Sequence, residues 1–236
     1  MTDLEKVPWN DLEPEFLQSW GWPTGKFQGE HLVIVGPTGS GKSKFQNHII
    51  KRRADVRGSH VYIIATKPAD EEMKNLHWPI VDKWPPPYGK HERVIFWHKA
   101  GKPGEGLQEQ RMAIAHMLDD VWRENANCLI VFDEIAYLED ELNLSRPVNR
   151  FWREARTLGI SMVAGTQRPR NVSRQMWAQA SWSVAFRPDD EDDAGRVAEI
   201  IGGRKKYRDA LLALDRYEFI IVERREKRAY VSKLKV

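Results

Sequence analysis

The chain has 236 residues, of which 41% are hydrophobic and 30% charged, so it is long and apolar enough for one large globular domain. A net charge of +3 permits a polyanionic partner but does not by itself indicate one, and the single cysteine, Cys128, excludes an internal disulfide. No apolar run approaches the roughly 20 residues of a membrane-spanning helix, and the first residues lack a signal-peptide pattern. We therefore expect a cytoplasmic protein without membrane insertion.

Residues 1–30 are rich in tryptophan, proline and acidic residues and show no clear hydrophobic period. This composition predicts an irregular N-terminal arm, packed either on the rest of the chain or on a neighbouring subunit. We expect a single domain over residues 31–236. The ten tryptophans of the chain are interpreted first as core and interface anchors, and stacking on nucleic acid is the alternative.

A glycine-rich loop follows the first apolar run, residues 31–35, and precedes a segment of helical character that extends to about Arg53. Strand, loop and helix in this order are what a P-loop requires, and its eight residues are Gly36, Pro37, Thr38, Gly39, Ser40, Gly41, Lys42 and Ser43. The loop amides and the helix N-terminus surround a phosphate. Lys42 then reaches the β- and γ-phosphates and Ser43 ligates Mg²⁺, so we expect ATP and Mg²⁺ as cofactors. A chance glycine-rich loop is the alternative.

Apolar strands alternate with helices along the rest of the chain. The predicted strands cover 60–65, 93–97, 128–132, 160–165 and 182–187, and the predicted helices cover 107–125, 148–158, 172–180, 190–201 and 204–213. Residues 218–223 and 227–232 form a C-terminal β-hairpin. This alternation predicts an α/β fold, with a mostly parallel central sheet that helices cover on both faces. Ligands of such sheets lie at the carboxyl ends of the strands.

Two further polar pairs follow predicted strands and point to the same site. Asp133 has the position of the acidic residue that holds Mg²⁺ in P-loop enzymes, and Glu134 can accept a proton from the attacking water. Gln167, after Thr166, ends a strand expected between the P-loop strand and the Asp133 strand, and its amide can sense the γ-phosphate or orient water. The alternatives are a helix cap for the acidic pair and an ordinary polar loop residue for Gln167.

An arginine supplied by a neighbouring subunit is the usual further requirement of such a site. Arg150, Arg153 and Arg156 are candidates, because they are spaced by three residues on one predicted helix. The alternative is a solvated basic face.

These motifs resemble the FtsK/HerA superfamily of DNA-pumping ATPases. The resemblance rests on the P-loop, on Asp133-Glu134, and on the run from Ala155-Arg156 through Gly159-Ile160 into Thr166-Gln167-Arg168-Pro169, and it covers about residues 30–190. It implies a RecA-like core, a hexameric ring and double-stranded DNA threaded through the central pore. By position, Arg156 resembles the family's trans-acting arginine, with Arg153 as the alternative, and Gln167 resembles its polar sensor.

The residues that would grip DNA are predicted from charge alone. A ring motor holds backbone phosphates without reading bases, and Arg168, Arg170 and Arg174 beside the sensor, with Lys99 and Lys102 in a glycine-rich loop, are the candidates. Each of these could equally be a solubilising surface charge.

The compact chain is similar to viral genome-packaging ATPases of the superfamily. We therefore expect an ATP-hydrolysing DNA translocase in the host cytoplasm or the virion, docked on a capsid or portal-vertex protein. The alternatives are a plasmid-transfer or defence-associated ATPase, a nucleotide or small-molecule kinase, and a nucleotide-switched assembly protein that is not a motor.

Overall fold

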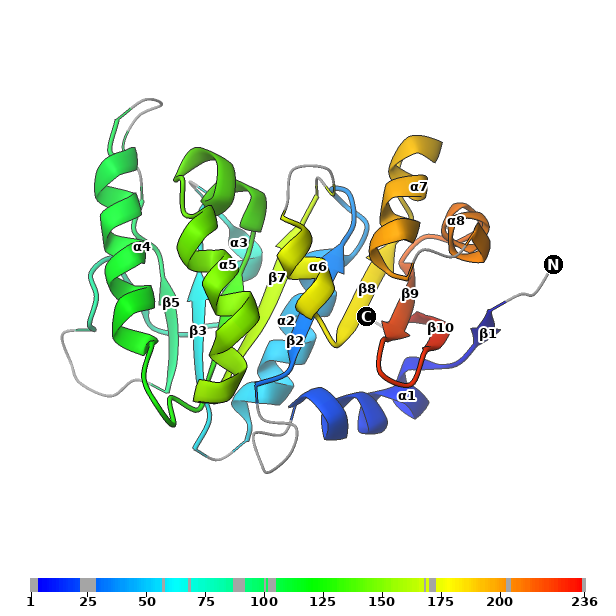
Figure 1. Ribbon diagram of the computed structural model, residues 1–236, viewed down its shortest axis with the longest axis horizontal. Coiled ribbons are helices and arrows are strands. Elements are labelled where there is room, and N and C mark those ends of the chain that lie inside the picture. The colour runs from blue at the N-terminus through cyan, green and yellow to red at the C-terminus, as the bar shows by residue number, and fades with distance from the viewer. Residues whose placement is uncertain are drawn as a thin grey trace.

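The computed structural model describes residues 4–21, 29–56, 58–67, 69–86, 92–99, 101, 105–167, 169, 173–202 and 205–234. Within these residues one sheet holds ten strands in the order β1-β10-β9-β8-β2-β7-β6-β3-β5-β4 (Figure 1). The strands are β1 (Glu5–Lys6), β2 (His31–Val35), β3 (His60–Ile64), β4 (Ile80–Val81), β5 (Arg93–Phe96), β6 (Cys128–Phe132), β7 (Ile160–Thr166), β8 (Trp182–Phe186), β9 (Glu218–Glu223) and β10 (Arg228–Lys233).

The centre of the sheet is parallel and one side of it is antiparallel. From β8 through β2, β7, β6, β3 and β5 to β4 all neighbours run parallel, whereas β9 is antiparallel to both β8 and β10. The predicted fold class and the predicted C-terminal hairpin are therefore confirmed. The parallel strands end toward the top of Figure 1, so their carboxyl ends form one continuous edge.

Helices cover both faces of the sheet. They are α1 (Trp9–Phe16), α2 (Lys42–Ala54), α3 (Glu71–Lys74), α4 (Leu107–Val121), α5 (Ser145–Glu154), α6 (Arg174–Gln179), α7 (Glu191–Ile200) and α8 (Lys205–Leu212). Apolar residues of α1, α2 and α3 share one core cluster, and those of α4 to α8 share the other. Among the helices of the described residues, none is long and apolar enough to cross a membrane.

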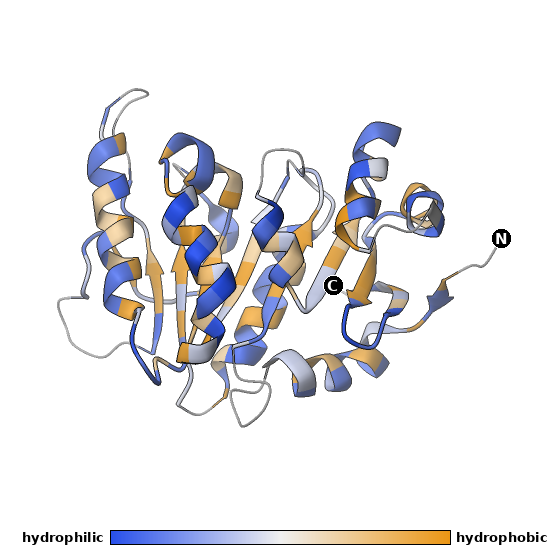
Figure 2. Cartoon of the chain, viewed as in Figure 1, coloured by the Kyte–Doolittle hydropathy of each residue, from blue (hydrophilic) through white to orange (hydrophobic). Residues whose placement is uncertain are grey.

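The alternation of side chains along each strand explains this two-sided core. In β2, Leu32 and Ile34 belong to the cluster of α2, while Val33 and Val35 belong to the opposite cluster. A strand buried on both faces reads as a continuous apolar run, which is why β2, β3 and β6 were predictable. Figure 2 shows apolar residues gathered in the strands and polar residues on the outer side of the helices.

The N-terminal segment is more regular than the expected arm. Its described part contains β1, the helix α1 and a π-helical turn, Leu17–Gly21, and β1 pairs with β10. Trp9, Leu12, Phe16 and Trp20 recur every three or four residues and are buried, so the segment packs as an amphipathic helix. Pro14 inside α1 and the high content of polar residues obscured this period in the sequence. The division into an arm and a domain stays a prediction.

Helix boundaries account for most other differences. The helix expected over 107–125 ends at Val121, and the one expected over 148–158 begins at Ser145 and tightens into a 3₁₀ turn over Ala155–Leu158. The order β2-β7-β6 confirms that the strand of Gln167 lies between the P-loop strand and the strand of Asp133. The fold therefore gathers all three predicted polar segments at one edge.

Candidate active site

The P-loop connects the end of β2 to the first residue of α2, at the carboxyl edge of the sheet. Gly36 N–H donates to the Thr166 carbonyl at 3.2 Å, so the pairing of β2 with β7 continues into the loop. Gly41, the residue before α2, has φ of 102°, a left-handed conformation in which a side chain is strained. This turn points the N-terminus of the 13-residue helix α2 into the loop, and a helix N-terminus attracts phosphate.

Lys42, the first residue of α2, is an ammonium group in an unusually enclosed position. It is only 4% exposed, and burial lowers its pKa, while the carboxylates of Asp133 and Glu134 partly oppose that shift. Lys42 and the N-terminus of α2 present positive charge to the loop, and this favours an anionic group there. A triphosphate would supply that group.

The acidic pair lies directly after β6, whose neighbours are β3 and β7. Asp133 is 2% exposed. Glu134 accepts a hydrogen bond from the Gln167 backbone N–H, with its Oε2 at 3.2 Å, and it is also hydrogen-bonded to the side chain of Thr166. Burial raises the pKa of Glu134, and Lys42 and these hydrogen bonds lower it in part. Glu134 is thus held in a defined orientation and interacts electrostatically with Lys42.

Gln167 connects the acidic pair to the P-loop. The Thr38 hydroxyl donates to Gln167 Oε1 at 2.7 Å, while the backbone of Gln167 donates to Glu134. Gly165, two residues earlier, allows this approach, because a Cβ there would lie 2.8 Å from the Asp133 carbonyl oxygen and 2.8 Å from Gln46 Oε1. The structure therefore brings together the P-loop, Asp133, Glu134 and Gln167.

Arg156 is not part of this cluster. It lies in the 3₁₀ turn before β7, at the amino edge of the sheet, where it donates to the Gln179 carbonyl at 3.0 Å and lies 3.8 Å from Glu30 Oε2. Arg225 also pairs with the buried Glu30. The alternative, Arg153, is an exposed residue of α5 near Glu154. The full length of the strands separates both arginines from the P-loop of their own chain.

A comparison with protein-family models identifies the fold from sequence. The model described as AAA domain matches residues 26–169, which is more than half of the chain. The chain belongs to the AAA domain family. Its membership makes it a P-loop ATPase, as predicted from the motifs.

Solved structures with the same fold include other ATPases. The genome packaging NTPase B204 from Sulfolobus turreted icosahedral virus 2 is 14% identical, with a TM-score of 0.64 over 89% of this chain and 98% of that one. VirB4 of Thermoanaerobacter pseudethanolicus is 13% identical, with a TM-score of 0.68 over 90% and 91%. The pCW3 conjugation coupling protein TcpA is 15% identical, with a TM-score of 0.56 over 86% and 59%. No curated protein matches the chain.

These neighbours have the fold that the superfamily resemblance predicts. At 13–15% identity the comparison shows a shared fold. Complexes of B204 with AMPPCP and with ATP-gammaS exist. Nucleotide binding by the AAA domain follows from the family and agrees with those complexes.

Oxygen ligands suited to Mg²⁺ are present at the AAA domain's P-loop. The hydroxyl of Ser43 and the buried carboxylate of Asp133 fit a hard cation, and a cation already contacts Asp133, since Lys67 Nζ lies 2.9 Å from its Oδ2. Among the described residues there is no cluster of three or more His, Cys, Asp or Glu side chains that could hold a metal. Mg²⁺ in such sites is commonly bound through one or two protein oxygens together with substrate phosphates.

Lys67 is the site residue that sequence reasoning missed. It follows β3, and β3 lies next to β6, so Lys67 emerges at the same edge as Asp133. The position of a lysine just after a predicted strand was the available signal. The sequence did not reveal that β3 is adjacent to β6.

Only two of the five residues predicted to contact DNA lie among the residues that the structure describes. Arg168, Arg170 and Lys102 lie outside the described residues. Arg174 is exposed at the start of α6, and Lys99 is exposed with its ammonium 5.0 Å from the centre of the Trp97 ring. Neither position tests the DNA prediction.

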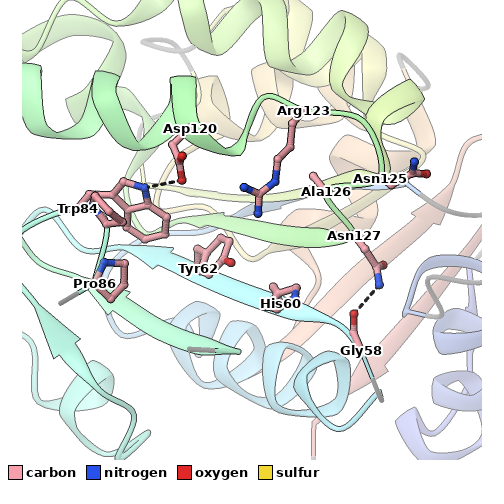
Figure 3. Close-up of a pocket in the computed structure, with 11 residues that line it drawn as sticks. Gly58, His60, Tyr62, Trp84, Pro86, Asp120, Arg123, Asn125, Ala126 and Asn127 are labelled. Carbon is pink, nitrogen blue, oxygen red and sulfur yellow. Dashed lines mark hydrogen bonds between the residues drawn. The ribbon is translucent and has the colours of Figure 1, made fainter. Parts of the chain in front are cut away.

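A separate cleft of about 630 Å³ lies at the opposite, amino edge of the sheet (Figure 3). The indole of Trp84 donates to Asp120 at 3.0 Å and meets the ring of Tyr62 edge-on, and Arg123 lies beside them. Burial raises the pKa of Tyr62 to about 12, so this phenol stays neutral. None of the predicted site residues lines the cleft in the described part of the chain.

Proposed function

We propose that this AAA domain is an ATP-driven translocase of double-stranded DNA that works as a ring, and that it packages the genome of a DNA virus. The observation that carries the proposal is the division of the site between two edges. Gln167 contacts both the P-loop residue Thr38 and Glu134, whereas Arg156 lies at the far edge of the sheet. Among the described residues, the candidates Arg153 and Arg156 both lie away from the P-loop of their own chain, so the arginine that usually balances charge on a transferring phosphoryl group would come from a neighbouring subunit.

The proposed roles of the residues follow from their contacts. Lys42 binds the β- and γ-phosphates, and Ser43 and Asp133 hold Mg²⁺, which neutralises charge on the phosphate oxygens when it is bound. Glu134 accepts a proton from the attacking water, since it is buried, oriented and next to the phosphate-binding cation. Gln167 links the occupancy of the P-loop to the orientation of Glu134.

Arg156 acts on the nucleotide of the next subunit in this proposal. A repeated head-to-tail interface brings the amino edge of one copy to the P-loop of another and closes into a ring, for which we propose a hexamer. Glu30 and the Gln179 carbonyl hold the guanidinium near the surface at 35% exposure, so it needs little ordering on assembly. Hydrolysis then depends on assembly.

DNA passes through the proposed ring without sequence readout. Arg168, Arg170, Arg174, Lys99 and Lys102 are the proposed contacts to backbone phosphates. The viral setting, with a capsid or portal-vertex protein as docking partner in the host cytoplasm, is supported by the fold shared with B204, a genome packaging NTPase. Plasmid transfer is the second candidate, because the conjugation coupling protein TcpA shares the fold as well.

The first test is steady-state ATP hydrolysis with and without linear double-stranded DNA, over protein concentrations that span assembly. We expect stimulation by DNA, a cooperative rise with protein concentration, and loss of both in Arg156→Ala. Arg52→Ala is the matched control, because Arg52 is a partly exposed arginine of α2 that pairs with Glu13 and is not one of the candidate arginines. Hydrolysis that is indifferent to DNA and to concentration would refute the translocase.

Mixing two inactive variants tests the contribution in trans directly. Glu134→Gln retains Arg156, and Arg156→Ala retains Glu134, so a mixed ring contains some interfaces with both groups intact. Random equimolar mixing makes about a quarter of the interfaces complete, and that share of activity should return. Absence of recovery in rings shown to be mixed would remove Arg156 from the neighbour's site. Assembly without turnover in the wild type would instead favour a nucleotide-switched scaffold.

A further inference from the structure

Lys67 lies between two carboxylates at the edge of the candidate active site. Its Nζ is 2.9 Å from Asp133 Oδ2 and 3.0 Å from Asp70 Oδ2. Asp133 comes from the end of β6, and Asp70 from the segment that leads into α3. One ammonium group therefore serves both the proposed metal ligand and a second acid.

Lys67 contributes to the charge balance of Asp133 by direct contact, beside the electrostatic attraction of Lys42. The carboxylate is almost fully buried, and a buried carboxylate without a partner is strongly unfavourable. Among the described residues, Lys67 is the cation in ion-pair contact with it. A Mg²⁺ ion on Asp133 would supply the same compensation, but it would bring two positive charges against one carboxylate. The ammonium and the metal therefore compete for Asp133.

The surroundings of Lys67 allow the side chain to move while the backbone stays in place. The Trp97 indole N–H donates to the Lys67 carbonyl at 2.8 Å, and Trp97 is itself buried. Asp70 is also fixed, because it caps α3 by accepting the Met73 N–H at 3.1 Å with its other oxygen. The lysine stem can thus rotate toward Asp70 without any change in the main chain.

We propose that Lys67 is a movable cation, which compensates Asp133 when the site lacks Mg²⁺ and shifts onto Asp70 when a Mg²⁺-nucleotide binds. The inference rests on the proposed role of Asp133 as a metal ligand. Lys67 is then a positioning residue that sets the Mg²⁺ requirement of nucleotide binding. Asp70 is the carboxylate that pairs with Lys67 when Mg²⁺ occupies Asp133.

The test measures binding of ADP at increasing free Mg²⁺ by calorimetry, without any turnover. Lys67→Met keeps the length of the side chain and removes its charge, so Mg²⁺ no longer has a competitor. We expect the Mg²⁺ midpoint of ADP binding to fall about tenfold in this variant. The metal-free variant should also melt at a lower temperature than the wild type, and Mg²⁺-ADP should restore most of the difference, because it compensates Asp133 again.

A second variant predicts the opposite sign. Asp70→Asn keeps a side chain that caps α3 but removes the charge that receives Lys67, so the lysine should remain on Asp133 and the Mg²⁺ midpoint should rise. Lys74→Met is the matched control, because Lys74 is a lysine of α3 that pairs with Glu71 at 2.5 Å and should leave the midpoint unchanged.

An unchanged or higher midpoint in Lys67→Met, or an unchanged or lower one in Asp70→Asn, would overturn the inference. Failure of the wild type to bind ADP with any Mg²⁺ dependence would instead overturn the metal role of Asp133 and with it the proposed function. The two failures are therefore distinguishable in one data set.

Discussion

Replacing Gly165 by alanine adds one methyl group and should lower kcat more than it lowers stability. Gly165→Ala puts a Cβ 2.8 Å from the Asp133 carbonyl oxygen, and ordinary contact begins at 3.4 Å, so the end of β7 and the end of β6 must move apart by about 0.6 Å. The obstacle is partly backbone, which cannot rotate away. This shift moves Asp133 and Glu134, at the end of β6, away from Thr166 and Gln167, at the end of β7.

The expected cost follows from overpacking and from misplacement. Overpacking of a close-packed interior costs about 1–3 kcal/mol, which corresponds to a fall in Tm of roughly 2–12 °C for a chain of this size. Displacement of a catalytic group by a fraction of an ångström to 1 Å costs up to about 10²-fold in kcat. We expect the larger effect on kcat, because the hydrogen bond from the Gln167 N–H to Glu134 is already 3.2 Å long.

Calorimetric unfolding and steady-state hydrolysis, measured on the same preparation, check this prediction. Gly195→Ala is the control, since a Cβ on Gly195 in α7 meets no atom within 4 Å, and alanine is favoured over glycine in a helix by about 0.5–1 kcal/mol. A Gly165→Ala protein with wild-type Tm and wild-type kcat would refute the argument that the two strand ends are held in contact at this residue.

Two further predictions concern Glu134 and His31. Glu134→Gln should bind ATP with nearly unchanged affinity, measured by calorimetry, and lose about 10²- to 10⁴-fold in kcat, because the amide cannot accept the proton of the attacking water; unchanged hydrolysis would remove Glu134 from that role. His31 is fully buried, and burial, aided by Arg156, lowers its pKa to about 3. The unfolded chain takes up this proton below about pH 6.5 and the folded chain does not, so stability should fall with pH between 6.5 and 3. Chemical denaturation at pH 6.5 and pH 5 should show wild type losing about 2 kcal/mol more than His31→Leu. Equal losses in the two proteins would contradict the assignment.

The local sequence predicted every central strand of the sheet, because a strand buried on both faces must be apolar throughout. Residues 31–35 and 128–132 are such runs, and both match β2 and β6 to the residue. The position of β7 between them followed from the motifs and is confirmed. The helix α1 was missed, because its three buried aromatic and aliphatic residues are spread among acidic residues and a proline.

The sequence by itself predicted the P-loop, the acidic pair and Gln167 as a sensor, since each is a short string whose chemistry depends on neighbours along the chain. Only the tertiary structure decided which distant residues join them. Lys67 contacts Asp133 because β3 pairs with β6, and Arg156 is held at the far edge by Glu30, which precedes β2. Gly165 is required by a carbonyl on the adjacent strand. Contacts of this kind depend on strand order and register, and these arise from packing of the whole sheet rather than from local residue preferences.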